Sequence, residues 1–263
     1  MELEVFVVDA FTDKKFQGNS AAVVPVLEWL SDELMQNIAA ENNLSETAFI
    51  KAIALNRYAI RWFSPITEID FCGHATLAAS YVLLHFLGCK GQIEFVTSKV
   101  GELQVNQLRD GRIEMSFPNQ LPEIVEDIPD ALLEGLSISP VKVLRNRQAY
   151  FAVLSSEQDV RNVQYYSDKL KLLAPYDAVV TAHANEFDFV SRYFWPANGG
   201  DEDPVTGSIH SGLAPYWAEQ LGKLDLTAYQ ASKRGGVLFC QVMNDRVLVS
   251  GFGVLYSRGT IYI

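Results

Sequence analysis

The segment from His74 to Leu87 is apolar on nearly every side of a helical wheel, and it ends at Gly88, a residue suited to the position after a helix. A surface helix has one apolar stripe, so a helix that is apolar all round must be surrounded by protein. The segment is too short to span a bilayer and contains His85. It therefore predicts a fold built around a central, buried helix.

Strand-like runs flank this helix on both sides in the sequence. Before it come β-rich or alternating runs at residues 3–9, 21–26 and 57–63 and an amphipathic helix after Ser31, and after it come runs at residues 93–97, 102–107 and 112–117. Asp110-Gly111 predicts a hairpin turn between the last two. The first half is thus expected to be several hairpin-linked strands and one long buried helix.

The second half repeats this plan in order, although not in residue identity. Strand-like runs lie at residues 141–144, 150–154, 178–181 and 187–194, a polar loop at 198–203 leads into a helix at 208–221 that stops at Gly222, and a hairpin at 237–242 and 247–251 turns at Asn244-Asp245. Residues 118–140 carry four prolines and predict a linker. The many hairpins argue against a doubly wound parallel sheet.

Composition excludes several classes of function. The 263 residues suffice for one large domain or two of moderate size, and the net charge of −11 argues against a nucleic-acid partner. A small anion remains acceptable, because backbone N–H groups can supply local positive potential. Three widely spaced cysteines without a CxxC pair indicate a reducing compartment, and the N-terminus has no basic signal-like region. We expect a cytoplasmic protein that does not enter membranes.

The first candidate site is Asp70-Phe71-Cys72-Gly73-His74-Ala75-Thr76, at the start of the buried helix. Gly73 lets the backbone turn sharply, and the first N–H groups of a helix bind anions without any Lys or Arg. The alternative is that Gly73 only eases entry into a core helix and that His74 is a polar cap. When this short motif is considered alone, the structural role is the favoured interpretation.

The second candidate site is the loop from Gly199 to Ser208, which holds the same place before the other long helix. Asp203 as N-cap with Pro204 at the first helical position is a structural explanation. A simple cap does not need Thr206-Gly207-Ser208 to follow, however, because two small hydroxyl residues around a glycine favour the close approach of a ligand. The position of the loop in the repeat strengthens the functional interpretation.

The third candidate is Glu46, within Leu44-Ser45-Glu46-Thr47-Ala48-Phe49. It lies where a helix is expected to end and a strand to begin, a place from which a side chain often projects from a rigid scaffold. Taken alone, it is interpreted as a surface glutamate, as most glutamates are.

Five strings in order resemble the phenazine biosynthesis-like family, which belongs to the diaminopimelate epimerase superfamily. They are Val8-Asp9-Ala10-Phe11, Gln17-Gly18-Asn19-Ser20-Ala21-Ala22-Val23, Leu44 to Phe49, Cys72-Gly73-His74-Ala75-Thr76 and Glu202-Asp203-Pro204-Val205-Thr206-Gly207-Ser208. The resemblance covers nearly the full length. It implies an α+β fold of two similar domains, each a mostly antiparallel sheet wrapped around a central helix, at residues 1–117 and 118–255, with residues 256–263 returning to the first.

The resemblance also implies an activity and a site. It implies a cofactor-independent isomerase that shifts a proton between carbons of a small carboxylate-bearing, anionic metabolite in a cleft between the domains, and a homodimer. Glu46 matches the general acid/base, with His74 and Asp203 as further catalytic residues. The substrate-binding set is Ser45, Cys72, Gly73, Gly207 and Ser208.

One departure from the pattern of the superfamily distinguishes two enzymatic hypotheses. Racemases of the superfamily use two opposed cysteines, but this chain has Cys72 at the first position and Val205 at the second. An amino-acid epimerase using Cys72 with another partner is therefore the weaker alternative, and a metabolite-binding protein without turnover is a third reading. There is no GxGxxG or GxxxxGK[ST] motif, and the histidines lack ligand spacing with Cys or carboxylates, so neither a cofactor nor a metal is expected.

Overall fold

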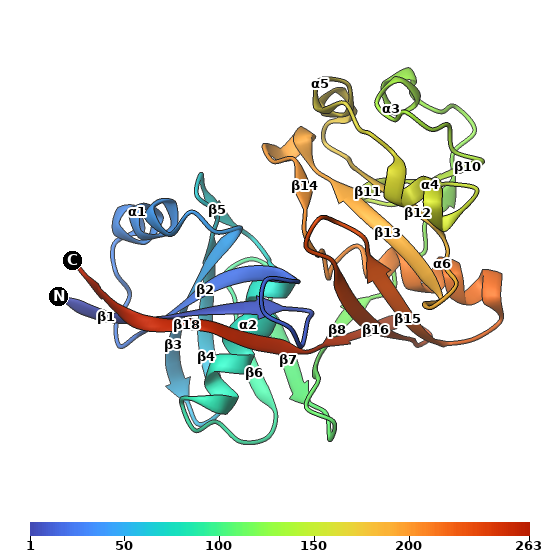
Figure 1. The fold of residues 1–263 in the computed structure, drawn as a ribbon. Coiled ribbons are helices and arrows are strands. Elements are labelled where there is room, and N and C mark those ends of the chain that lie inside the picture. The colour runs from blue at the N-terminus through green and yellow to red at the C-terminus, as the bar shows by residue number, and fades with distance from the viewer. The chain divides into compact units, whose positions relative to one another are not determined.

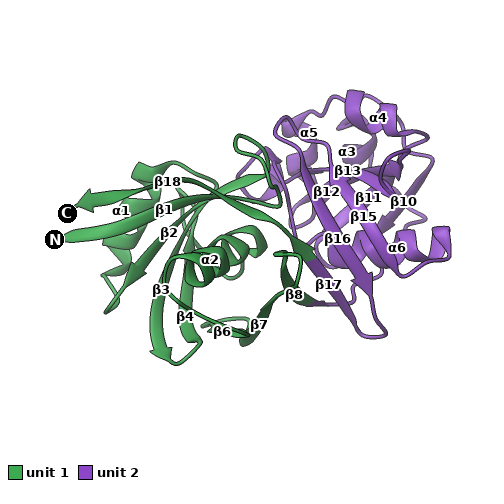
Figure 2. Cartoon of the chain, turned by 60° about the horizontal axis from the view of Figure 1, so that its bottom comes forward, with its two compact units in different colours: residues 1–116, 250–263 green, residues 117–249 purple.

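A computed structural model describes residues 1–263, and the chain divides into two compact units (Figure 2). Unit 1 comprises residues 1–116 and 250–263, and unit 2 comprises residues 117–249. Each unit is a mixed, mostly antiparallel sheet with a long helix, as the sequence pattern predicts, so the predicted α+β class is confirmed.

The sheet of unit 1 is built from nine strands (Figure 1). They are β1 (Glu2–Ala10), β2 (Asn19–Val26), β3 (Glu46–Ala54), β4 (Arg57–Phe63), β5 (Glu68–Ile69), β6 (Ile93–Val96), β7 (Glu102–Gln107), β8 (Ile113–Pro118) and β18 (Gly253–Tyr262). β18 pairs antiparallel with β1 along its length, which returns the C-terminus to the N-terminal unit. The chain ends lie side by side there, since Ile263 N–H donates to Met1 O.

Two parallel pairs interrupt the antiparallel order of unit 1. β2 pairs parallel with β3, and β4 pairs parallel with β6. Parallel neighbours need a crossover, which is usually a helix. Here α1 (Asp32–Asn42) makes the first crossover, capped by Ser31 Oγ, and α2 (Gly73–His85) makes the second.

α2 is the central helix of unit 1. Every residue of its first eight positions, from Gly73 to Ser80, is buried, and the helix packs against β1, β2 and β3. Only the last turn emerges, with His85 exposed, which agrees with the nearly all-round apolar pattern. The helix ends two residues before the predicted Leu87, and Gly88 then takes a φ of +73°.

Unit 2 repeats this order of pairing. Its strands are β9 (Glu123–Ile124), β10 (Lys142–Arg145), β11 (Ala149–Val153), β12 (Asp177–His183), β13 (Phe189–Phe194), β14 (Glu202–Asp203), β15 (Asp225–Gln230), β16 (Gly236–Val242) and β17 (Arg246–Gly251), the last crossing into unit 1. β11 pairs parallel with β12 and β13 with β15, while β12 and β13 are antiparallel. The internal repeat predicted from the order of segments is therefore present in the pairing.

The long helix of unit 2 is α6 (His210–Leu221), which contains Pro215. Proline has no N–H, so the carbonyl four residues earlier loses its helical donor. That carbonyl belongs to Ser211, and the N–H of Gln120 donates to it at 3.0 Å. α6 thereby binds the segment that opens unit 2. It begins two residues later than predicted, and Asp203, in β14, is not its N-cap.

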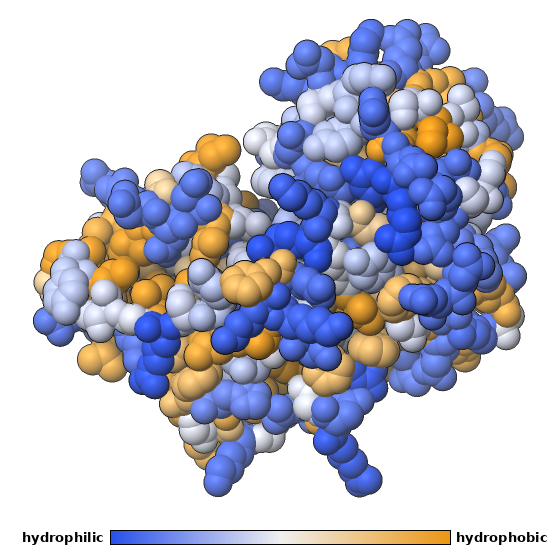
Figure 3. Space-filling model, in the orientation of Figure 1, coloured by the Kyte–Doolittle hydropathy of each residue, from blue (hydrophilic) through white to orange (hydrophobic).

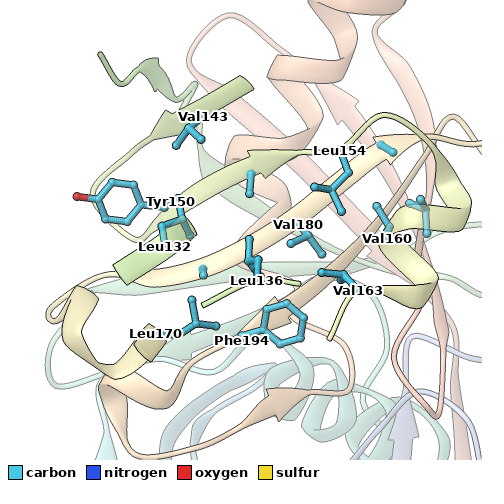
Figure 4. Packing of buried hydrophobic residues seen from close by; sticks show 14 of the residues in the cluster. Leu132, Leu136, Val143, Tyr150, Leu154, Val160, Val163, Leu170, Val180 and Phe194 are labelled. Atoms are coloured by element: carbon cyan, nitrogen blue, oxygen red, sulfur yellow. The ribbon is translucent and has the colours of Figure 1, made fainter. Parts of the chain in front are cut away.

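The prediction of a linker at residues 118–140 is wrong. The segment contains β9 and the short helix α3 (Asp130–Glu134), and Leu132 and Leu136 are buried in the apolar core of unit 2 (Figure 4). They pack with Leu170 of α5 (Ser167–Leu170) and Val160 of α4 (Glu157–Asn162). The four prolines suggested an extended linker between the two halves of the chain, but burial of these leucines holds the segment against the sheet.

Hydrophilic side chains cover most of the face seen in Figure 3, with hydrophobic residues scattered among them. None of the helices combines the length and the apolar character required to cross a membrane.

The position of α6 depends on close packing at Gly212. A Cβ there would lie 2.7 Å from Phe151 Cζ and 2.8 Å from Asn146 Nδ2. Phe151 is buried, and Asn146 Nδ2 donates to Gln120 O, so neither moves easily. We expect Gly212→Ala to lower the free energy of unfolding by about 1–3 kcal/mol through overpacking, measured by urea denaturation.

Gly259→Ala is the matched control, because Gly259 is exposed in β18 and a Cβ there meets nothing within 4 Å. It should change stability by less than about 0.5 kcal/mol. Equal stability of the two variants would refute the close packing at α6.

Candidate functional site

The fold brings together the predicted site residues of the first half. β2 and β3 are parallel, so Asn19 and Glu46, the first residues of these strands, lie at the same edge of the sheet. The chain then reaches His74 in the first turn of α2, and all three side chains are buried. Glu46, predicted from its position at the start of a strand, therefore points inward and is not a surface glutamate.

The central contact is between Glu46 and His74. His74 Nε2 lies 2.8 Å from Glu46 Oε2, and both side chains are at most 10% exposed. Despite the short distance, Oε2 accepts no hydrogen bond, because the ring does not align its N–H with that oxygen. The contact is an ion pair with one carboxylate oxygen left unsatisfied in the interior, an arrangement that costs free energy unless the group has another use.

Asn19 holds the opposite side of the His74 ring. Its Nδ2 lies 3.1 Å from His74 Nδ1, and Ser45 Oγ donates to Asn19 Oδ1 at 2.9 Å. A neutral ring accepts from the amide through Nδ1. If Nδ1 carries a proton, the amide turns over and accepts instead, because the Ser45 hydroxyl can donate or accept. The network thus tolerates either charge state of His74.

Burial and charge act in opposite directions on this cluster. Burial first, and the Glu46 charge next, raise the pKa of Cys72 to about 11, so the thiol is uncharged at neutral pH. Burial lowers the pKa of His74, but Cys72 and Glu46 outweigh burial and raise this pKa well above its ordinary value. Since Cys72 is a thiol at neutral pH, Glu46 is the partner that holds a proton on His74.

Cys72 is the residue before α2, and its Sγ lies 3.4 Å from His74 Nδ1. The possibility that the helix N-terminus makes it a reactive thiolate is not supported by its raised pKa. Gly73 is the first residue of the helix and is buried. The N–H of Thr76 donates to Cys72 O, so the groups without helical partners are those of the three residues before it.

Asp9 supports this cluster from β1. It is buried beside Ser20, whose Oγ donates to Asp9 Oδ1, and its other oxygen accepts the N–H of Phe16 at 3.1 Å. These two hydrogen bonds tie the start of β2 and the loop before it to Asp9 of β1. Asp9, Asn19 and Ser20 lay inside the strings that carried the family resemblance, but residue chemistry alone did not single them out.

The predicted residues of the second half form a separate cluster in unit 2. Thr206 Oγ1 donates to Asp203 Oδ2, and buried Gln230 closes the turn between them. Gln230 Oε1 accepts the Thr206 N–H at 2.9 Å, while its Nε2 donates to Asp203 O at 2.9 Å. Gln230 follows Asp203 by 27 residues, so no local spacing revealed it.

Ser208 belongs to a chain of polar contacts that starts at a carboxylate. Tyr193 Oη donates to Asp177 Oδ2 at 2.5 Å, and Gln148 Nε2 lies 3.0 Å from both Tyr193 Oη and Ser208 Oγ. Because Gln148 donates to Ser208, the hydroxyl proton of Ser208 is free to point at another acceptor. Gly207, next to Ser208, is buried. Sequence reasoning missed Gln148 and Tyr193.

Folding also brings three metal-ligand types together. One ligand atom from each of Glu46, Cys72 and His74 lies within 4.8 Å of the other two. The sequence contains Cys72 and His74 two positions apart, but the carboxylate is remote in sequence, so the spacing of the histidines did not predict the cluster.

The model of the phenazine biosynthesis-like protein family matches residues 8–259. The chain belongs to this family. An uncharacterized isomerase of Pseudomonas aeruginosa is 46% identical over 100% of both chains. A crystal structure of a PhzF-family protein from Enterococcus faecalis has a TM-score of 0.95 at 39% identity, with 100% of both chains covered.

A solved structure with much lower sequence identity has a similar fold. A hydroxyproline epimerase from Agrobacterium vitis, solved with bound trans-4-hydroxy-L-proline, has a TM-score of 0.64 at 10% identity. The match covers 99% of this chain and 92% of the epimerase. At this identity the likeness concerns the fold alone, which is the fold that the family resemblance implied.

His210, at the start of α6, gives the unit 2 cluster a pH-dependent stability. It is fully buried beside Phe189, its Nδ1 lies 2.8 Å from Thr206 O, and its Nε2 has no partner. Burial lowers its pKa from 6.5 to about 4. The unfolded chain therefore binds the proton more readily, and the stability present above pH 6.5 is lost as the pH falls toward 4.

We expect wild type to lose about 3 kcal/mol more unfolding free energy between pH 7 and pH 4 than His210→Gln, which cannot titrate. Urea denaturation at several pH values measures the difference. The exposed His183→Gln variant should follow wild type. Parallel curves for wild type and His210→Gln would contradict the assignment.

Proposed function

We propose that the chain is a cofactor-independent isomerase that moves a proton between carbons of a small carboxylate-bearing substrate, with Glu46 as the general acid/base. The observation that carries the proposal is the state of Glu46 Oε2, which is buried, accepts no hydrogen bond and lies 2.8 Å from His74 Nε2. A purely structural carboxylate would have its oxygens satisfied. A general base needs a free lone pair to take a proton from carbon.

The neighbours of Glu46 suit that role. His74 can compensate the charge of the carboxylate, because the two groups are in contact. The first N–H groups of α2 supply positive potential for the carboxylate or developing negative charge of a substrate. A positioned acid/base group of this kind typically contributes about 10²–10⁴-fold to a proton transfer. The isomerase name of the 46% identical relative supports the reaction class.

Asp203 and Ser208 are proposed to act on the same substrate, as the family resemblance implies. Thr206 and Gln230 hold the Asp203 turn, and Gln148 leaves the Ser208 proton available for a substrate oxygen. Both side chains are thus oriented by contacts within unit 2. We also carry forward a homodimer and a cytoplasmic location as proposals from the same resemblance.

The thiol-based alternative has less support. A two-base racemase needs an acid/base group opposite its thiol, but Val205 is a buried, apolar residue and the pKa of Cys72 is raised to about 11. A thiol protonated at neutral pH is a poor base.

The decisive experiment is a screen of small carboxylates for solvent-deuterium incorporation in heavy water, followed by mass spectrometry. With any substrate found, Glu46→Gln should lower the exchange rate by at least about 100-fold, because the amide cannot accept the proton. Its thermal unfolding should remain cooperative. Glu28→Gln, which removes an exposed carboxylate paired with Lys51, is the matched control and should keep full activity.

Full exchange by Glu46→Gln would refute the acid/base role. Loss of exchange in Cys72→Ser together with retention in Glu46→Gln would establish the thiol mechanism instead. Saturable binding of a carboxylate without exchange at any concentration would support the reading as a binding protein.

A further inference from the structure

Three side chains at the N-terminus of α2 offer sulfur, nitrogen and oxygen ligands to a common point. Cys72 Sγ lies 3.9 Å from His74 Nε2, and that nitrogen lies 2.8 Å from Glu46 Oε2. All three residues are buried, at 7%, 5% and 8% exposure. Clusters of Cys, His and a carboxylate within such distances are the donor sets that hold borderline metal ions in proteins.

The unsatisfied oxygen of Glu46 is the independent observation that points to a ligand. Oε2 is fully buried and has no hydrogen-bond partner. It is close to His74 Nε2 but not aligned with its N–H, so a lone pair of Oε2 stays free, and Nε2 gains one when its proton leaves. Two ligand atoms that lie this close together without a hydrogen bond between them are positioned to coordinate the same metal ion.

We propose that Cys72, His74 and Glu46 form a three-ligand binding site for Zn²⁺, with the fourth position open to water. Zinc sites with an open position take three protein ligands, and zinc accepts thiolate, imidazole and carboxylate together. In a tetrahedral site the ligating N and O atoms are about 3.3 Å apart, so the His74–Glu46 contact has to open by roughly half an ångström. Binding deprotonates the Cys72 thiol and removes the Nε2 proton of the His74 imidazolium, and both protons are released to solvent.

Asn19 supplies the outer partner that such a site requires. A ligating histidine uses its second ring nitrogen to hydrogen-bond a neighbour, which fixes the ring orientation. Here Nδ1 faces the Asn19 amide at 3.1 Å, and Ser45 holds that amide from behind. With Nε2 on the metal, Nδ1 carries the proton and the amide presents its oxygen. The network that tolerates both charge states of His74 therefore also accommodates the metal-bound ring.

Zinc in this position would inhibit the protein. The ion takes Glu46 Oε2, the atom that proton transfer uses, so metal binding and turnover exclude each other. This consequence rests on the proposed function, whereas the metal site itself does not. Zinc would thereby act as a reversible inhibitor of an enzyme that needs no metal for its reaction.

Cobalt is the probe for the site, because Co²⁺ replaces Zn²⁺ and is coloured. Titration of the reduced, metal-free protein with Co²⁺ should give the intense visible bands of a tetrahedral ion and a near-ultraviolet thiolate-to-cobalt band, and Zn²⁺ should displace both. Cys72→Ser should abolish the thiolate band and weaken binding at least about 100-fold, since a ligand is lost. Asn19→Ala should weaken binding about 10–100-fold, as loss of outer partners does.

The chain offers matched controls in Cys89→Ser and Cys240→Ser, which remove the other two buried thiols. Both should retain the full spectrum and affinity. A wild-type protein that binds Co²⁺ no more tightly than Cys72→Ser, or that shows only the weak bands of an octahedral ion, would overturn the proposal.

The inhibitory consequence is tested separately with any substrate found by deuterium exchange. Zn²⁺ should reduce exchange at the concentration that fills the cobalt-probed site, and a chelator should restore it. Stimulation by Zn²⁺ would overturn the exclusion of turnover by metal. An inactive Glu46→Gln variant in chelator supports the acid/base role whatever the metal result, so failure of one proposal is distinguishable from failure of the other.

Discussion

Burial of α2 on all sides of its first turns is the constraint on which the rest of unit 1 depends. A helix without a polar face must be enclosed, and the chain does this with a sheet in which β18 returns from the far end of the sequence to pair with β1. α2 crosses between the parallel strands β4 and β6, and the amphipathic α1 makes the corresponding crossover between β2 and β3. Enclosure also buries the N-terminus of α2, where Glu46 and His74 are in contact.

This arrangement explains how residues that are distant in sequence form one buried cluster. Parallel pairing places the first residues of β2 and β3 at one edge, and the helix that follows β5 begins nearby, so Asn19, Glu46 and His74 meet although they are distant in sequence. Within the low-dielectric interior, burial lowers the pKa of His74, but contacts with Cys72 and Glu46 outweigh burial and raise it. Strand pairing thus sets the positions of these side chains, and their burial strengthens the charge interactions between them.

Periodicity predicted the elements well where one physical pattern dominated. The strand expected at residues 57–63 is β4, and the all-round apolar helix is α2, because burial leaves a clear signature in hydropathy. The start of α6 was predicted two residues early, since the N–H groups of His210 and Ser211 donate to carbonyls three residues earlier, a tighter turn than that of an α-helix. The prolines of residues 118–140 hid the burial of Leu132 and Leu136. Similarly, Gln148 and Gln230 act through contacts remote in sequence, which no local pattern records.

The two units place a carboxylate at the same position of one topology but surround it with different hydrogen-bond donors. Asp177 opens β12, the second strand of the parallel pair β11–β12, as Glu46 opens β3 of the pair β2–β3. Asp177 receives hydrogen bonds on both oxygens, from Tyr193 and Asn198, and its work is to hold that network. Glu46 Oε2 receives none. Since the fold supplies both with the same position, the difference lies in the donors around them, and the carboxylate left without a donor is the one that we propose as the general acid/base.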